Sequence, residues 1–446
     1  MRNILLIGAG RSSTSLINYF LKQAQIENWI LTVADFTKEI AVEKVNNHPA
    51  GVAVSFNVED EIERRNLVSK SDIVISLLPP NMHLPIAIEC LVQKKNLVTA
   101  SYVTPEMQAL SNEAAANGII FLNECGLDPG IDHMSAMEII DQVKDNGGIL
   151  TSFRSYTGGL VAPESNDNPW GYKFSWNPRN VILAGQGTAR FIEDGNYKYV
   201  PYSRLFTNNE NIAIEGHGNF DGYANRDSLS YRKIYGLENI KTLIRGTLRQ
   251  SGFCHAWNVF VQLGLTDDSY MIEDSQHLTY KKLVEAFLPS NVSGKSIEEK
   301  LVKFTGLASD STEMKLILWT GILADEIIGL ENASPAMILQ NLLEPKWKLK
   351  DSDKDMIVMQ HLFEYILDGK KVKRTSSLVV KGDDPVHTAM AKTVGLPAAI
   401  AATQILNGKI SLKGVVIPVH KQIYEPVLRE LKLLGISFAD RQTEIV

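Results

Sequence analysis

The sequence has few cysteines and no long apolar run. Three cysteines occur in 446 residues, Cys90, Cys125 and Cys254, and they form no CxxC pair. A sparse, odd set argues against a disulfide framework and a zinc site and suits a reducing compartment. No stretch approaches the roughly 20 apolar residues of a membrane helix, and Met1-Arg2 leads straight into an apolar strand. We expect a cytoplasmic protein with no metal and no membrane partner.

The sequence also lacks a basic surplus. The formal net charge is −6 at pH 7, which gives no reason to expect a nucleic-acid partner. A hydrophobic fraction of 44% and a charged fraction of 22% are typical of a globular protein. A chain of 446 residues exceeds what one core usually organises, so two or three domains are expected.

The N-terminal third alternates short apolar runs with amphipathic ones, which indicates βαβ units and a parallel sheet. Helices are expected over 13–25, where apolar residues share one face, and over about 105–116. The expected strands are Ile4–Ile7, Trp29–Ala34, Gly51–Phe56, Ile73–Leu78, Leu97–Ala100 and Ile119–Leu122.

After Gly148 the pattern changes. Asp368-Gly369 lies between two apolar runs and predicts a β-hairpin of 356–367 and 372–380, because a type I′ turn needs positive φ at both central residues. The last 60 or so residues return to α/β alternation. The other elements expected are strands at Phe153–Tyr156, Asn211–Ile214, Trp257–Leu263 and Val415–Ile417, a helical stretch from about Tyr280 to Leu343, and helices at Ala398–Leu406 and Tyr424–Leu434.

A glycine-rich loop joins the first strand to the first helix. Gly8 permits a tight turn, and Gly10 lets the backbone approach a pyrophosphate that the following helix N-terminus would face. Ser13 replaces a third glycine with another small residue, and its hydroxyl could donate to a phosphate. The remaining loop residues are Arg11 and Ser12. This context predicts a dinucleotide site.

Asp35 ends the second strand, where an acidic residue accepts from the ribose hydroxyls of NAD and repels the 2′-phosphate of NADP. We therefore expect NAD, with NADP as the less favoured alternative, since Lys38 is close in sequence. An ordinary turn role for Asp35 is the competing interpretation. Further candidate cofactor contacts follow the third and fourth strands: Asn57, Val58, Leu77, Leu78 and Pro79.

The segment 123–133 is dense in turn formers and ionisable groups. Asp128-Pro129-Gly130 reads as a turn that caps the next helix. The string NECGLDPGIDH closely resembles the saccharopine dehydrogenase family, the glutamate-forming kind also called saccharopine reductase. The resemblance also includes GAGRSS, SLLPP, ASYVTPEM, GGL-x-APES-x-DNP-x-GYKFSW, YANRDS and IRGTLRQSGF.

The resemblance implies an α/β fold: a variant Rossmann domain over 1–130 completed by 385–446, and an α/β substrate-binding and dimerisation domain over 131–384 with a helical insert at about 278–345. It also implies a homodimer. The implied reaction joins glutamate and 2-aminoadipate 6-semialdehyde as an imine that NAD(P)H reduces to saccharopine, reversibly, in lysine metabolism. The partner is thus a small amino-acid substrate.

The resemblance carries site residues with it. Tyr102 and Asp128 match catalytic positions that orient the reacting nitrogen or relay a proton, and Leu127, Asp128 and Pro129 also match cofactor contacts. The matched substrate-binding positions are Ser101, Tyr102, Trp176, Arg226, Thr247, Leu248 and Arg249. Each aromatic or arginine could instead be structural.

Other charged residues have weaker claims. Arginine suits carboxylates because its planar fork binds both oxygens, so Arg245 or Lys173 could hold a third carboxylate or form a structural ion pair. His133 is expected to be structural.

Two departures and two alternatives stand beside this interpretation. The second strand ends in the acidic Asp35 where the family has a basic residue, which bears on the choice of cofactor. Thr157 replaces the cysteine usual in the family's YCGG string, so a thiol role is excluded here. A related reductive aminase, such as a carboxynorspermidine dehydrogenase, is the alternative enzyme, although two arginines favour a polycarboxylate product. A cofactor-binding homologue without turnover is the alternative outside enzymes.

Overall fold

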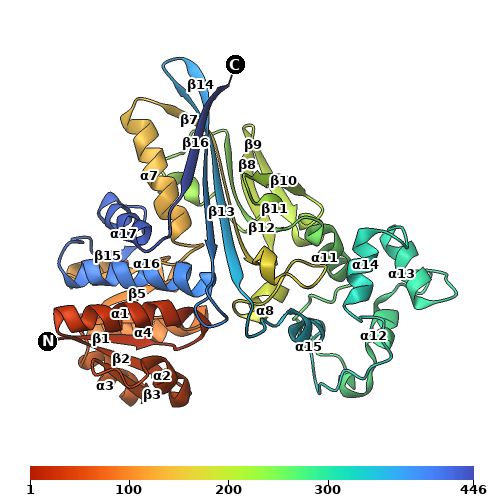
Figure 1. Ribbon diagram of the computed structural model, residues 1–446, viewed down its shortest axis with the longest axis horizontal. Coiled ribbons are helices and arrows are strands. Elements are labelled where there is room, and N and C mark those ends of the chain that lie inside the picture. Colours follow the sequence, from red (N-terminus) through yellow and green to blue (C-terminus); the bar gives the residue numbers. More distant parts are fainter. Residues whose placement is uncertain (446) are drawn as a thin grey trace. The chain divides into compact units, whose positions relative to one another are not determined.

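The computed structural model describes residues 1–445 and contains two compact units, whose elements are labelled in Figure 1. The first unit comprises Met1–Leu150, Tyr365–Val372 and the chain from Leu378 onward, and the second comprises Thr151–Glu364 and Lys373–Ser377. Helices and strands are mixed in both units, so the α/β class expected from the sequence is confirmed.

The first unit is built on a seven-stranded parallel sheet of order β15-β6-β5-β4-β1-β2-β3. The order reverses direction next to β1, and doubly wound sheets bind dinucleotides at the carboxyl edge of such a switch point. The expected Rossmann-like sheet is thereby confirmed. Its strands are β1 (Arg2–Ile7), β2 (Trp29–Asp35), β3 (Gly51–Ser55), β4 (Ile73–Ser76), β5 (Asn96–Thr99), β6 (Ile120–Leu122) and β15 (Gly414–Val416).

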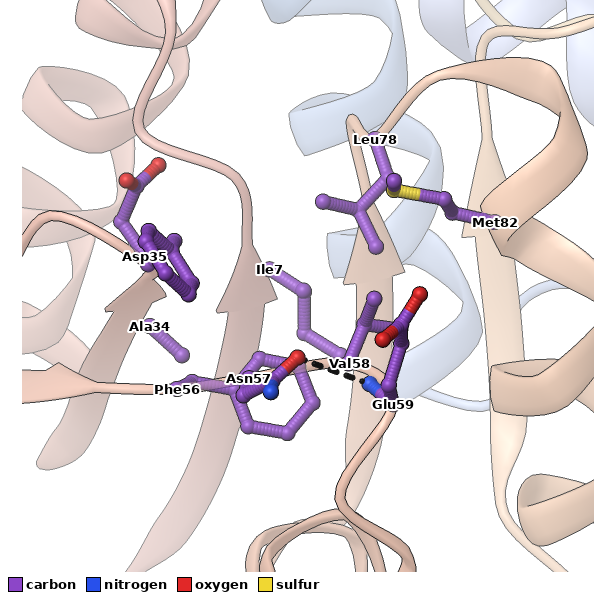
Figure 2. Close-up of a pocket in the computed structure, with 10 residues that line it drawn as sticks. Ile7, Ala34, Asp35, Phe56, Asn57, Val58, Glu59, Leu78 and Met82 are labelled. Carbon is purple, nitrogen blue, oxygen red and sulfur yellow. Dashed lines mark hydrogen bonds between the residues drawn. The ribbon is translucent and has the colours of Figure 1, made fainter.

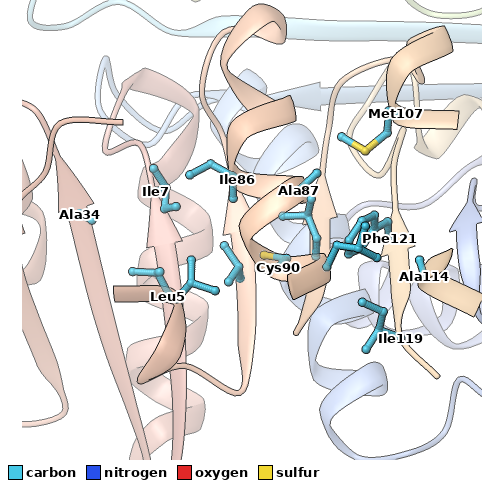
Figure 3. Packing of buried hydrophobic residues seen from close by; sticks show 14 of the residues in the cluster. Leu5, Ile7, Ala34, Ile86, Ala87, Cys90, Met107, Ala114, Ile119 and Phe121 are labelled. Atoms are coloured by element: carbon cyan, nitrogen blue, oxygen red, sulfur yellow. The ribbon is translucent and has the colours of Figure 1, made fainter. Parts of the chain in front are cut away.

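A close-packed apolar core covers one face of this sheet (Figure 3). Leu5 and Ile7 of β1 pack with Ala87 and Cys90, and Phe121 of β6 lies in the same cluster. Burying this apolar surface is the main force that holds the helices on the sheet. The helices on this face are α3 (Glu61–Ser69), α4 (His83–Val92), α5 (Pro105–Ala109) and α6 (Ser111–Ala116).

A C-terminal helix completes the first unit. Helix α16 (Ala389–Leu406) lies beside α1 (Thr14–Glu27) (Figure 1). A Cβ on Gly395 would stand 3.0 Å from the carbonyl oxygen of Ser12, so glycine permits this close approach. Helix α16 is long and apolar enough to cross a membrane, but 83% of it is buried inside the protein, as in a core helix. The unit also contains α2 (Lys38–Val45), α7 (Ile131–Asp145), α17 (Lys421–Leu433) and β16 (Ala439–Ile445).

The second unit carries most of a nine-stranded sheet of order β10-β11-β12-β7-β13-β14-β16, in which β8 also pairs with β12 and β9 pairs with β8. Asp368 and Gly369 have φ values of 50° and 76°, so the expected hairpin turn is confirmed. The strands are β7 (Ile149–Val161), β8 (Thr188–Glu193), β9 (Asn196–Pro201), β10 (Asn209–Ile214), β11 (Gly218–Ala224), β12 (Thr242–Gln250), β13 (Asp355–Leu367) and β14 (Lys370–Lys381).

One predicted strand of this unit is wrong. Trp257–Leu263 lies in helix α11 (Phe253–Gln262) and its C-cap, because a short apolar run suits a buried helix as well as a buried strand. The helical stretch after Tyr280 is confirmed, although several turns interrupt it. The remaining helices are α8 (Pro178–Ile182), α9 (Tyr202–Leu205), α10 (Tyr231–Ile234), α12 (Tyr280–Phe287), α13 (Ile297–Thr305), α14 (Thr312–Trp319) and α15 (Pro335–Trp347).

Candidate active site

The glycine loop connects β1 to α1 through a short 3₁₀ turn, Arg11–Ser13. Gly8 has φ +101° and donates its N–H to Ala34 O at 2.8 Å, and a Cβ here would lie 3.1 Å from Leu77 O. Glycine is therefore required at this position. Around Gly10 nothing lies within 4 Å of an added Cβ, so its backbone face is open. A loop of this shape at a helix N-terminus fits a pyrophosphate.

A lysine absent from the sequence-based site reaches this loop. Lys44 Nζ donates to Gly10 O and, at 2.9 Å, to Ser13 Oγ, and burial lowers the Lys44 pKa to about 8 despite the charge of Asp35. Ser13 Oγ itself donates to Gly10 O at 2.8 Å. In the structure this hydroxyl closes the turn, and its donation to a phosphate stays a prediction.

Asp35 stands at the carboxyl end of β2, as the sequence predicts. Its Oδ2 accepts from Ala9 N at 2.7 Å and its Oδ1 from Thr37 N at 2.9 Å. These backbone bonds fix the carboxylate beside the glycine loop. Each carboxylate oxygen keeps a further lone pair for another donor, such as a sugar hydroxyl.

Asp35 borders a pocket of about 300 Å³ at this edge of the sheet (Figure 2). Leu78 and Met82 stand on the opposite side from Asp35, and Asn57 Oδ1 accepts from Glu59 N at 3.0 Å at the base. A mostly apolar pocket with a few polar groups fits the adenosine half of a dinucleotide. Of the residues predicted for the cofactor, Asp35, Asn57, Val58 and Leu78 line the pocket, together with Ile7, Ala34, Phe36, Phe56, Glu59 and Met82.

The segment 126–130 forms a tight turn with two apposed glycines. Gly130 has φ +149°, and a Cβ there would lie 2.0 Å from Gly126 O. Gly130, not Asp128, is the N-cap of α7, so the predicted capping role of Asp128 is wrong. The turn leaves Asp128 half-buried, and its Oδ1 accepts from Tyr102 Oη at 2.9 Å. The two predicted catalytic side chains are thus in contact.

Buried groups hold the Ser101–Val103 segment that carries Tyr102. Glu124 donates its N–H to Ser101 O at 3.0 Å, and its Oε1 accepts from Val103 N at 3.0 Å. The imidazole of His133 contacts Glu124 Oε2 at 2.9 Å, and both side chains are buried. His133 thus holds a carboxylate that supports the segment.

A second set of predicted residues lies on one face of the second unit's sheet. Thr157 of β7 pairs with Thr247 of β12, which also pairs with Tyr223 of β11. Because side chains alternate along a strand, Arg249 shares this face, whereas Leu248 points to the other. The Leu248 carbonyl still accepts from Arg249 Nη1 at 3.0 Å.

Arg249 is buried and forms no ion pair within the part of the chain that the structure describes, residues 1–445. Its side chain is 5% exposed, and its guanidinium carbon lies 5.4 Å from the Tyr172 ring centre and 5.6 Å from that of Phe253. Asp221 of β11 lies directly opposite Arg249, but its Oδ2 accepts from Gly252 N at 3.0 Å and Cys254 N at 3.2 Å, and it forms no ion pair with Arg249. Nearby, Thr157 Oγ1 is buried and has no hydrogen-bond partner among residues 1–445. A buried guanidinium is costly unless an anion compensates it.

Trp176 belongs to the same surroundings. Its indole and Arg249 partly oppose the burial that raises the pKa of Tyr172, which places Trp176 next to that tyrosine. Trp176 itself is half-buried. The aromatic rings and Arg249 therefore form one continuous group in the second unit.

The remaining predicted cations differ in setting. Arg226 is exposed and adopts φ +48° directly after β11. Arg245 is buried and lies 4.1 Å from the ring centre of Tyr231, a structural stacking contact. Lys173 is 1% exposed and pairs with Asp353 at 2.5 Å and with Asp167 at 2.7 Å. Of the two roles expected for Lys173, binding a third substrate carboxylate or forming a structural ion pair, the structure shows the ion pair.

Comparison with known proteins identifies the family. Residues 4–122 match the domain described as saccharopine dehydrogenase NADP binding domain, and residues 126–436 match the saccharopine dehydrogenase C-terminal domain. The chain is 34% identical to saccharopine dehydrogenase (NADP(+), L-glutamate-forming) of Pyricularia oryzae, over 97% of this chain and 96% of that protein.

Two further comparisons extend this result. The apo saccharopine dehydrogenase (L-Glu forming) of Saccharomyces cerevisiae superposes with a TM-score of 0.88 at 32% identity, covering 99% of this chain and 100% of that one. Alpha-aminoadipic semialdehyde synthase of Mus musculus is 37% identical over 99% of this chain, but the chain spans about half, 48%, of that relative's length. The chain therefore belongs to the saccharopine dehydrogenase family and carries that family's nicotinamide-dinucleotide-binding domain.

Proposed function

We propose that the chain is an oxidoreductase that interconverts saccharopine with L-glutamate and 2-aminoadipate 6-semialdehyde, in lysine metabolism. The observation that carries the proposal is Arg249, a buried guanidinium that forms no ion pair with any carboxylate among residues 1–445, since Asp221 opposite it accepts from Gly252 N and Cys254 N instead. A substrate carboxylate would supply the missing anion through a bidentate pair. Family membership supports the same reaction, since the fungal relatives are named for it.

A nicotinamide dinucleotide fits the first unit. Gly8 and Gly10 would face the pyrophosphate, and Asp35 with the pocket beside it would hold the adenosine half. Leu78 and the Leu127–Pro129 turn would lie toward the nicotinamide end. When bound, the oxidised cofactor supplies the hydride acceptor, so saccharopine, water and NAD(P)+ give glutamate, the semialdehyde, NAD(P)H and a proton.

Tyr102 and Asp128 are the groups proposed to move protons. Tyr102 Oη donates to Asp128 Oδ1, so the carboxylate can hold a proton that the substrate nitrogen releases while Tyr102 fixes its orientation. Opening of the imine by water needs proton transfers at oxygen and at nitrogen, which this pair can serve in turn. Thr157 Oγ1, which lacks a protein partner within residues 1–445, would donate to a substrate carboxylate.

The preference between NAD and NADP depends on Asp35. We propose NAD, because the carboxylate fixed by Ala9 N and Thr37 N would repel a 2′-phosphate. The NADP description of the matched domain and the NADP in the names of fungal relatives do not support this preference. Comparing kcat/KM for both cofactors decides it: NAD should be the better substrate, and Asp35→Ser should shift the ratio toward NADP.

A substrate comparison separates the proposal from its alternatives. Purified protein is mixed with oxidised cofactor and either saccharopine or carboxynorspermidine, and reduced-nicotinamide absorbance is followed. Turnover of saccharopine alone supports the proposal, and faster turnover of carboxynorspermidine would replace it with the related reductive aminase. Cofactor binding without turnover of either would favour the non-catalytic homologue.

We also propose an oligomeric state and a location for the protein. The family resemblance favours a homodimer, which sedimentation at several protein concentrations tests directly. A cytoplasmic location is proposed from the three free, buried cysteines, which suit a reducing compartment. Direction of flux, toward synthesis or degradation of lysine, is set by metabolite levels because the reaction is reversible.

A further inference from the structure

A buried histidine joins the ends of two neighbouring strands in the first unit. His83 is the first residue of α4 and is 4% exposed. Its Nδ1 lies 2.8 Å from the hydroxyl oxygen of Ser76, at the end of β4. Its Nε2 lies 2.7 Å from Ser101 Oγ and 3.2 Å from Thr99 Oγ1, at and just past the end of β5.

The backbone of Ser101 is fixed by hydrogen bonds, so His83 controls the orientation of the Ser101 hydroxyl. The Ser101 N–H donates to Thr99 Oγ1 at 3.2 Å, and its carbonyl accepts from Glu124 N at 3.0 Å. Only the direction in which the Ser101 hydroxyl donates its hydrogen is not fixed by these bonds. At 2.7 Å a single hydrogen must lie between Ser101 Oγ and His83 Nε2, and it comes from one of them.

The buried hydroxyls favour one tautomer. Ser76 is fully buried, and among residues 1–445 its hydroxyl forms a side-chain hydrogen bond with His83 alone, so its hydrogen is satisfied by donating to Nδ1. Nε2 then carries the ring hydrogen and donates to Ser101. In the Nδ1–H tautomer, the Nε2 lone pair accepts one strong hydrogen bond, from Ser101. The hydroxyl hydrogens of Ser76 and Thr99 then both lack an acceptor, whereas in the Nε2–H tautomer only that of Thr99 does.

We infer that His83 is a positioning residue: its Nε2–H holds the Ser101 oxygen and leaves the Ser101 hydroxyl hydrogen free to donate to a substrate carboxylate. The substrate contact rests on the proposed function, whereas the tautomer does not. Burial lowers the pKa of His83 to about 4, which keeps the ring neutral near pH 7. A neutral ring donates from one nitrogen only, so the direction of the Ser101 hydroxyl is defined.

The tautomer is tested without any turnover. Long-range ¹H–¹⁵N spectra of the histidine rings, with His83 identified by the signals lost in His83→Gln, report which nitrogen carries the hydrogen. The expected result is a neutral Nε2–H ring at pH 7 whose Nε2 signal moves in Ser101→Ala. An Nδ1–H ring, or signals unchanged by Ser101→Ala, would overturn the inference.

Kinetics test the role. An asparagine amide can reach the Nδ1 position and a glutamine amide the Nε2 position, so His83→Gln should keep KM for saccharopine within about threefold while His83→Asn raises it roughly tenfold. Ser101→Ala should have a similar effect, and the double variant His83→Asn/Ser101→Ala should be no worse than either single. KM for the cofactor should stay unchanged throughout. The exposed His217→Asn is the matched control.

The outcomes are distinguishable. Additive effects in the double variant, or no rescue by glutamine, would show that His83 acts through the fold and not through Ser101. If the wild-type protein does not oxidise saccharopine, the proposed function fails, and the spectra alone then decide for or against the His83 tautomer.

Discussion

At the scale of single residues, the second unit contains a buried arginine, Arg249, that forms no ion pair with residues 1–445. Arg249 is surrounded by aromatic rings, and these offer a buried guanidinium weaker compensation than a carboxylate would. A side chain kept in this setting lowers stability unless a ligand uses it. Stability and substrate binding should therefore respond in opposite directions when the charge is removed.

Arg249→Met tests this opposition. Loss of a bidentate partner should lower kcat/KM for saccharopine roughly a hundredfold, while thermal stability stays equal or rises because the uncompensated charge is gone. Cofactor affinity, measured by fluorescence titration, should not change. The exposed Arg204→Met is the matched control. Lower stability with unchanged kcat/KM would assign Arg249 a structural role instead.

His83 should make stability depend on pH. Its pKa is lowered from 6.5 to about 4 by burial, so the unfolded chain binds a proton over a range where the folded protein does not. Folding stability is therefore lost as pH falls from about 6.5 toward about 4. This loss amounts to about 3 kcal/mol at most. Urea unfolding of wild type and His83→Gln at pH 7, 5.5 and 4.5 should show a shallower pH slope in the variant; equal slopes would contradict it.

At the scale of elements, the loop that carries Tyr172 and Trp176 is anchored by a buried ion pair. Lys173 pairs with Asp353, which directly precedes β13, and both are nearly inaccessible. Lys173→Met should cost about 3 to 5 kcal/mol, because Asp353 is left as a buried charge. Lys173→Met/Asp353→Leu should recover much of that loss. Chemical denaturation measures both, and a double variant less stable than the single would contradict the account.

The glycine loop offers a matched pair of variants. Gly8→Ala forces alanine to φ +101° against Leu77 O, so stability should fall by about 2 kcal/mol. Gly10 has φ −63° and open space, so Gly10→Ala should keep stability but weaken cofactor binding roughly tenfold by placing a methyl group in the pyrophosphate path. Calorimetry and cofactor titration separate the two effects. Unchanged cofactor affinity in Gly10→Ala would place the dinucleotide elsewhere.

Long, regular elements were the most predictable from the sequence. Strand β1, the hairpin turn at Asp368-Gly369 and helix α17 follow from apolar period and turn chemistry, which are local properties. Helix α11 was mistaken for a strand because the apolar run Trp257–Leu263 is too short to distinguish a helical period from a buried strand. Which of the two forms is decided by packing against distant segments, which a local pattern does not contain.

The site residues also differed in whether a local sequence pattern could predict them. Tyr102 and Asp128 were named as site residues only through family resemblance, and their contact was not predicted, since 26 positions separate the two residues. Lys44 and His83 were missed because each acts through contacts with strand ends or loops that only the fold brings close. Asp128 was misassigned as a helix cap, because the turn at Gly130 places the helix start two residues later.

At the scale of the whole molecule, the candidate groups belong to two compact units. The first holds the dinucleotide loop, Tyr102 and Asp128, and the second holds Arg249 and Thr157. The fungal relatives match this chain over nearly their whole length, whereas the chain covers about half of the animal ones. Both units together should therefore be tested for the complete reaction.

The most direct test counts products. The purified chain is incubated with saccharopine and oxidised cofactor, and glutamate and reduced nicotinamide are quantified in the same samples. The account predicts one glutamate for each reduced cofactor, with no glutamate when cofactor is omitted. Tight cofactor binding with no glutamate formed would contradict the proposed reaction and leave only the family and the fold.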